Sequence, residues 1–165
     1  NMPQLLTLER VVLESISKGH NRLNSIQTDV GLQLSLVLSI LSKLMKKGYI
    51  TLNQGSYQIL DNELAWKKAS KKENVKEEIH ELSESLVNNY FSNPSKNCLK
   101  VQKIYLSESD EKIFGSLLYN LEAFIVSLRK DQREKGIRPS SKDQKVIMWG
   151  YSNYQNILED ICDVV

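Results

Sequence analysis

A helical repeat and a hairpin pattern follow one another directly in residues 33–60, which read QLSLVLSILSKLMKKGYITLNQGSYQIL. Apolar residues at intervals of three and four predict one buried helix face, formed by Val37, Ile40, Leu41 and Leu44. Gly48 follows two lysines, which is typical of a helix C-terminus because glycine accepts the left-handed conformation and lysine complements the helix dipole. The segment therefore predicts a helix that ends near residue 47 and leads straight into a hairpin.

Two short strands are expected in this hairpin, over residues 49–52 and 57–60. The Asn-Gln-Gly-Ser stretch between them has the residue types that tolerate turn geometry. Upstream, an apolar repeat from Leu8 to Ile16 predicts a first helix, and residues 22–28 predict a short second helix, with Asp29-Val30-Gly31 as the turn. Helix, helix, longer helix and hairpin is the order of elements in a winged helix-turn-helix, which we expect over residues 1–62.

The middle of the chain is more polar. Residues 61–73 are rich in lysine and predict either a linker or an irregular helix. An amphipathic helix follows and is expected to end before Asn93-Pro94, because proline cannot continue a helix. Its apolar seam comprises Val75, Ile79, Leu82, Leu86 and Tyr90. This seam either packs within the chain or pairs with a second copy.

The last third predicts a long helix between two strands. Ser107 is expected to cap the helix, because acidic residues crowd the first turn, and Gly136 to end it. Its wide apolar face predicts burial on more than one side. Branched residues predict strands at 99–106 and 145–151, and residues 154–165 predict a short terminal helix. Because two strands alone are marginal, we expect them to extend the hairpin's sheet or to pair with a second subunit.

The expected fold class is therefore mainly α with a small β component (α+β). A winged helix-turn-helix in residues 1–62 would be followed by a helix-strand-helix-strand region in residues 63–165. We expect that second region to serve dimerisation and sensing.

The composition excludes several classes of protein. With 41% hydrophobic and 25% charged residues, the chain resembles an ordinary globular protein. No apolar run approaches the ~20 residues of a membrane helix and no signal-peptide pattern is present, so a cytoplasmic location without membrane contact is expected. Cys98 and Cys162 form no CxxC pair, and no histidine lies at ligand spacing from them, so no metal is expected. The sequence has no phosphate-binding loop, nucleophile elbow or His-Glu metal motif. We therefore expect a protein that is not an enzyme and has no cofactor.

Charge is distributed unevenly. Residues 1–60 carry six Lys/Arg against three Asp/Glu, whereas residues 81–165 carry eleven against twelve. A basic amino-terminal region suits contact with the phosphates of double-stranded DNA. In a winged helix, the exposed side of the third helix reads base edges, here from Gln33, Ser35, Ser39 and Ser42. The expected phosphate contacts are Lys43, Lys46, Lys47 and Arg22, and the expected wing-tip contacts are Asn53, Gln54 and Ser56.

Four segments resemble a known family when taken in order. They are VLSILSKLMKKGYITLNQGSYQIL, VKEEIHELSESLVNNYF, IYLSESDEKIFGSLLYNLEAFIVSL and VIMWGYSNY. In this order and spacing they resemble bacterial proteins with a carboxy-terminal domain of unassigned function, usually preceded by a separate helix-turn-helix. The resemblance implies a transcriptional regulator and brings no catalytic residues. The present sequence lacks the leading helix-turn-helix and has Tyr154-Gln155-Asn156 where the family has Phe-Pro.

Two functions remain open on this basis. The first is a DNA-binding transcriptional regulator acting as a homodimer, since symmetric operators favour symmetric proteins. The second is a winged-helix module that binds another protein without touching DNA. The third helix has no arginine, and Leu34, Leu36 and Leu38 make its start unusually apolar for a DNA-facing surface.

Overall fold

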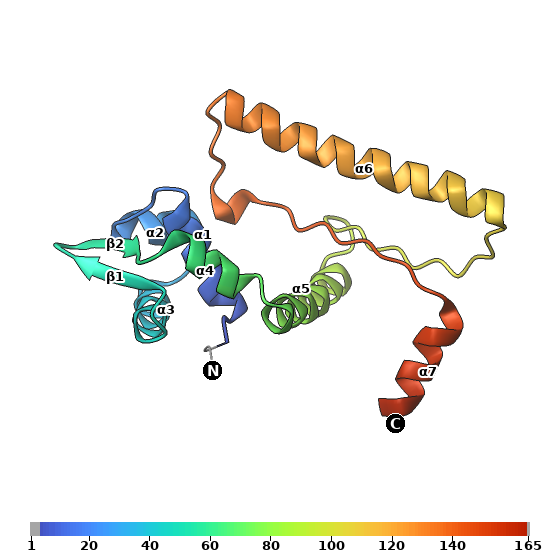
Figure 1. Ribbon diagram of the computed structural model, residues 1–165, viewed down its shortest axis with the longest axis horizontal. Coiled ribbons are helices and arrows are strands. Elements are labelled where there is room, and N and C mark those ends of the chain that lie inside the picture. Colours follow the sequence, from blue (N-terminus) through green and yellow to red (C-terminus); the bar gives the residue numbers. More distant parts are fainter. Residues whose placement is uncertain (1–3, 165) are drawn as a thin grey trace. The chain divides into compact units, whose positions relative to one another are not determined.

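The computed structural model describes residues 4–164, and Figure 1 shows the elements along the chain. In that range the chain forms seven α-helices, one short 3-10 turn and one two-stranded antiparallel sheet. The elements are α1 (Thr7–Ser17), α2 (Leu23–Val30), α3 (Leu34–Lys46), β1 (Ile50–Asn53), β2 (Ser56–Ile59), α4 (Asn62–Ala69), α5 (Lys72–Ser92), α6 (Glu108–Glu134), η1 (Ser141–Asp143) and α7 (Tyr154–Val164). The coarse expectation, mainly helical with a small sheet, is confirmed.

Two compact units divide the chain. The first unit comprises residues 1–94 with 139–146, and the second comprises residues 95–138 with 147–165. The boundary expected at residue 62 stays a prediction. Ala65 and Ala69, which follow the hairpin, belong to the hydrophobic cluster formed by the first three helices and the hairpin. No single helix in residues 4–164 is long and apolar enough to cross a membrane.

The core of the first unit lies between α1, α2, α3 and the hairpin. The predicted apolar face of α3 is buried, since Val37, Leu41 and Leu44 are fully inaccessible and Ile40 nearly so. From α1 and α2, Val12, Leu13 and Ile26 pack into the same cluster. Burying such side chains is the main favourable term in folding, at roughly 1.5–3 kcal/mol each. The helix repeat read from the sequence therefore builds the core.

The predicted hairpin forms, but each strand is shifted by one residue toward the turn, which is two residues long and not four. Ile50 pairs with Ile59, Leu52 with Tyr57 and Asn53 with Ser56 in an antiparallel register. Gln54 and Gly55, the two turn residues, both have positive φ, at 52° and 77°. A two-residue turn with two positive φ angles matches the right-handed twist of the strands it joins. Figure 1 shows the hairpin projecting from the helices of the first unit.

The second helix is longer than expected. It was expected to end at Thr28, but α2 continues to Val30, and Gly31 ends it in the left-handed conformation with φ 72°. Asp29 is buried inside this helix and takes no part in a turn. Three residues, Gly31 to Gln33, then join α2 to α3 across a bend of 112°.

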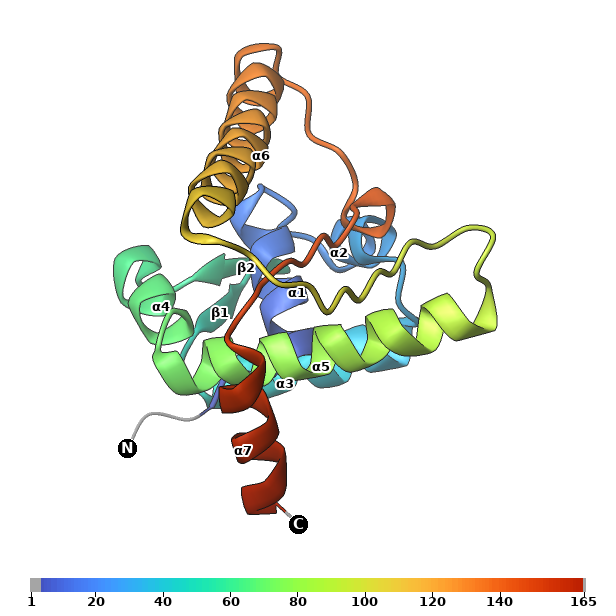
Figure 2. The same ribbon diagram turned by 90° about the vertical axis from the view of Figure 1, so that its right-hand side faces the viewer.

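Polar contacts attach α4 and α5 to α1. The polar stretch after the hairpin is a helix, α4, capped by Asp61, whose carboxylate accepts a hydrogen bond from the Leu64 amide at 3.0 Å. Arg10 of α1 contacts Glu78 of α5 at 2.7 Å and donates to the Ala69 carbonyl at 2.6 Å. The Asn74 side chain accepts from the Leu5 amide and donates to the Lys68 carbonyl. Figure 2 shows α5 continuing as a long straight helix.

The second unit differs most from expectation. The Ser107 cap of α6 is confirmed, since its hydroxyl accepts from the Asp110 amide and the Asp110 carboxylate accepts from the Ser107 amide. The strands expected at 99–106 and 145–151 are wrong within this chain, because neither segment forms a ladder. A strand needs a partner for its amides and carbonyls. Residues 145–151 are exposed, and so are most of residues 99–106. The Phe114 and Tyr151 rings meet edge to face, with their centroids 5.2 Å apart.

Candidate nucleic-acid interface

The exposed side of α3 carries a polar row. Spacings of four, three and four place Ser35, Ser39, Ser42 and Lys46 in one line, and this line lies opposite the buried residues. Three of the four are exposed and Ser42 is half-buried. Gln33, the residue before the first turn of α3, is also exposed. All four predicted base-edge residues therefore lie on or beside the solvent face of a single helix.

Leucines flank this row. Leu34, Leu36 and Leu38 are 42%, 38% and 43% exposed. Helical spacing places Leu34 and Leu38 on one side of the serine row and Leu36 on the other. None of the three belongs to the core cluster. The apolar start of α3 noted in the sequence is thus a surface feature.

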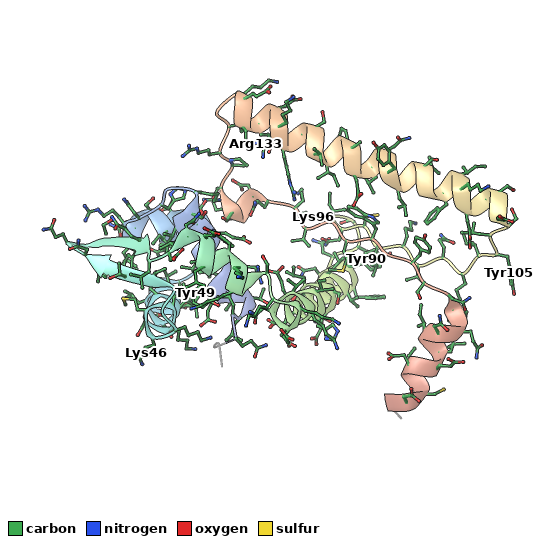
Figure 3. All side chains as sticks on the ribbon, viewed as in Figure 1. Lys46, Tyr49, Tyr90, Lys96, Tyr105 and Arg133 are labelled. Carbon is green, nitrogen blue, oxygen red and sulfur yellow. The ribbon has the colours of Figure 1, made fainter. Side chains whose placement is uncertain are left out.

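The three lysines at the end of α3 have different surroundings. Lys43 and Lys46 are exposed, and neither makes an ion pair within residues 4–164. Figure 3 shows Lys46 projecting from the outer side of α3. The Lys47 ammonium instead lies 2.6 Å from the Glu9 carboxylate, which is 1% exposed, and donates to the Gln4 carbonyl at 2.6 Å. Lys47, a predicted phosphate contact, is occupied by a structural ion pair.

Arg22 holds the tip of the hairpin. Its guanidinium donates to the Gln54 carbonyl at 2.9 Å, and the Tyr57 amide donates to the Asn21 carbonyl at 2.7 Å. A side chain at Gly55 would place its Cβ 2.8 Å from the Arg22 guanidinium. The predicted wing-tip residues Asn53 and Gln54 are exposed and Ser56 is half-buried. The start of α2 therefore fixes where the hairpin tip lies relative to α3.

A buried carboxylate behind α3 was not singled out in the sequence. Asp29, 4% exposed, accepts hydrogen bonds from the Lys18 ammonium at 3.2 Å and from the Ser141 amide and hydroxyl at 3.0 and 2.9 Å. The Ser140 hydroxyl donates to the Asp29 carbonyl at 2.7 Å. These bonds draw residues 139–146 back onto α2. The one sequence signal for this network is the position of Asp29, two residues before Gly31, the glycine that ends the helix.

The charge state of Asp29 follows from these contacts. Burial by itself raises the pKa of a carboxyl group, because it disfavours the charged form. The nearby Ser15 hydroxyl and the hydrogen bonds from the Ser141 amide and hydroxyl and from Lys18 outweigh that effect and lower the pKa of Asp29 to about 2. Asp29 is therefore ionised at neutral pH and acts as a structural anchor beneath the α2–α3 junction.

Within residues 4–164, no three His, Cys, Asp or Glu side chains gather as a metal site. No protein family, curated protein or solved structure matches this chain. The family resemblance drawn from the four sequence segments stays a prediction.

Proposed function

We propose that this chain is a DNA-binding transcription regulator whose residues 5–60 act as a winged helix-turn-helix. The observation that carries the proposal is the outer face of α3, where Ser35, Ser39 and Lys46 form an exposed row opposite the core. The three-residue, glycine-containing link and the 112° bend between α2 and α3 fall within the geometry of helix-turn-helix motifs.

Docking of α3 in the major groove would use this row for base contacts. Serine hydroxyls donate or accept and so tolerate several bases, whereas Gln33 at the helix start can pair with both polar atoms of an adenine edge. The selectivity expected from such a row is modest. Sequence preference would rest mainly on Gln33 and on the shape of the duplex.

Phosphate contacts would come from Lys43 and Lys46, because both are exposed and have no acidic partner within the described chain. Lys47 and Arg22 would act indirectly, Lys47 by holding α3 on α1 and Arg22 by placing the hairpin tip. Asn53 and Gln54 at that tip would reach the neighbouring backbone. With residues 1–60 carrying six basic and three acidic side chains, electrostatic attraction to DNA is moderate.

Fluorescence anisotropy with a labelled random-sequence duplex, measured across a salt series, tests the proposal. Affinity should fall with rising salt, and the Lys43→Ala/Lys46→Ala variant should reduce the magnitude of the log–log slope by about 0.9 for each lost contact. The variant Lys100→Ala/Lys112→Ala, which removes two exposed charges from the second unit, is the matched control and should leave the slope unchanged. Absence of binding at low salt, or equal effects of both variants, would contradict direct DNA contact by α3.

A second function is favoured by the three exposed leucines of α3. A winged-helix module that binds another protein would use Leu34, Leu36 and Leu38 as an apolar contact surface. The same anisotropy assay distinguishes DNA binding from protein binding when the Leu34→Ser/Leu38→Ser variant is measured as well. DNA binding that survives this variant but fails without the two lysines supports groove docking, whereas no DNA binding by any variant supports a protein partner.

A further inference from the structure

The second unit has no buried core within the described residues. Every buried side chain in residues 4–163 belongs to the first unit, and α6 contributes none. Figures 1 and 2 both show no other helix of its unit lying along α6. An amphipathic helix gains most of its stability from packing its apolar side, so α6 requires a partner surface.

Five of the apolar residues of α6 lie at heptad spacing. Alternating spacings of three and four give Phe114, Leu117, Leu121, Phe124 and Leu128. Leu117 and Phe124 are each 59% exposed and Leu128 is 41% exposed. Leu121 is half-buried, and the Phe114 ring already packs on Tyr151 of its own chain. A heptad of this kind is the pattern of a helix that pairs with another helix along one seam.

The two ends of α6 carry opposite charge. Residues 108–112 contain three acids and one lysine, a net −2, whereas residues 129–135 contain four basic and two acidic side chains, a net +2. Figure 3 places Tyr105 just before the acidic end and Arg133 near the basic end. Two parallel copies would set like charges side by side. Two antiparallel copies would set each acidic end against a basic end.

We propose that α6 pairs with α6 of a second copy of this chain to form an antiparallel homodimer. In antiparallel heptads, one core position faces the other core position of the partner helix. Leu117 then faces Leu128 of the second copy, and Leu121 faces Phe124. The same alignment sets Phe114 opposite Asp131 and, beyond it, Asp110 opposite Lys135, so opposite charges meet at both ends of the seam. The inference goes beyond DNA contact and does not depend on it.

Sedimentation equilibrium of the full chain, from micromolar to hundreds of micromolar, tests the pairing. Wild type should be a dimer, and Leu117→Glu/Phe124→Glu should be a monomer, because four carboxylates would be forced into the seam. Tyr119→Glu/Val126→Glu is the matched control, since both residues are exposed apolar positions on the opposite side of α6. It should remain a dimer. A monomeric wild type, or a dimer that survives Leu117→Glu/Phe124→Glu, would overturn the proposal.

Disulfide trapping tests the orientation and does not depend on how well the glutamate variant folds. Cys98 and Cys162, both exposed, are first replaced by serine. Leu117→Cys and Leu128→Cys chains should cross-link when mixed and oxidised, but neither should cross-link with itself. In the antiparallel pair, the two copies of residue 117 lie about 16 Å apart along the axis, too far for a disulfide. Self-cross-linking of either single variant would contradict the antiparallel arrangement.

Discussion

At the scale of single residues, two lysines that are adjacent in the sequence have different surroundings in the structure. Lys46 and Lys47 are neighbours, yet only Lys47 meets a buried carboxylate. The partner, Glu9, is 38 positions away in the sequence, and its other oxygen has no hydrogen-bond partner among the described residues. A helical wheel cannot identify such a partner. Helical periodicity therefore identifies the exposed face of α3, but it does not identify which lysine forms an ion pair.

This difference predicts opposite consequences for two adjacent substitutions. Lys47→Ala should lower the free energy of unfolding by about 3 kcal/mol, because it leaves the buried Glu9 side chain without its cationic partner. Lys46→Ala should change it by less than about 0.5 kcal/mol, because that side chain is exposed. Urea unfolding followed by circular dichroism measures both. Equal stability of the two variants would show that the ion pair contributes nothing to the fold.

Asp29 predicts a specific acid sensitivity. Its pKa is about 2 in the folded chain and 3.8 for an ordinary aspartate, so its contribution to stability is complete above pH 4 and is lost as the pH falls toward 2. The shift corresponds to about 2 kcal/mol. Wild type and Asp29→Asn should therefore differ by about that amount at pH 6, by about half of it near pH 3, and converge as the pH falls to 2 and below, as measured by urea midpoints. A gap that stays constant over this range would contradict an ionised, hydrogen-bonded Asp29.

At the scale of elements, local signals worked well where a helix or a turn is specified by near neighbours. The α3 repeat, the Ser107 cap and the hairpin turn all depend on residues within a few positions of one another. The strands expected at 99–106 and 145–151 do not form within the described chain. β-Propensity describes a single segment and does not supply the neighbouring strand with which it must pair. Whether these segments pair with a second subunit stays a prediction.

The hairpin turn and α6 give a matched pair of glycine substitutions. Gly55→Ala should destabilise the chain by about 1 kcal/mol or more, because φ is 77° and the new Cβ would crowd Arg22. Gly115→Ala should instead stabilise α6 by up to about 1 kcal/mol, since nothing lies within 4 Å of the added atom and alanine favours a helix. Thermal unfolding followed by circular dichroism should show shifts of opposite sign. A gain from Gly55→Ala would mean that the tip does not hold its positive φ.

At the scale of the whole molecule, the chain leaves the first unit at residue 94 and returns to it at residues 139–146. The return is held by Asp29, whose partner Ser141 lies 112 positions away. The Lys142 side chain also lies against Gly31, at 3.2 Å from where a Cβ would stand. This connection ties the junction of α2 and α3 to the segment that leaves α6.

Removing the serine contacts should free the return segment. In Ser140→Ala/Ser141→Ala, trypsin should cut after Lys142 and Lys145 several-fold faster, because both hydroxyl bonds to Asp29 are lost. Helix content should not change. Ser116→Ala, which removes an exposed hydroxyl that donates to Lys112 within α6, is the control and should leave the cleavage rate unaltered. Mass spectrometry of the fragments measures this, and equal rates in all three proteins would refute the anchor.

The sequence by itself determined most of the helices, the Ser107 cap, the presence of the hairpin and the outward face of α3, because each depends on periodicity or turn chemistry over a few residues. It also determined that the start of α3 is apolar. Only the tertiary structure decided that Lys47 and Arg22 are engaged, that Asp29 is a buried anchor and that residues 139–146 return to α2. These features join groups 32 to 112 positions apart, and a buried charge takes whichever partner the packing brings within reach.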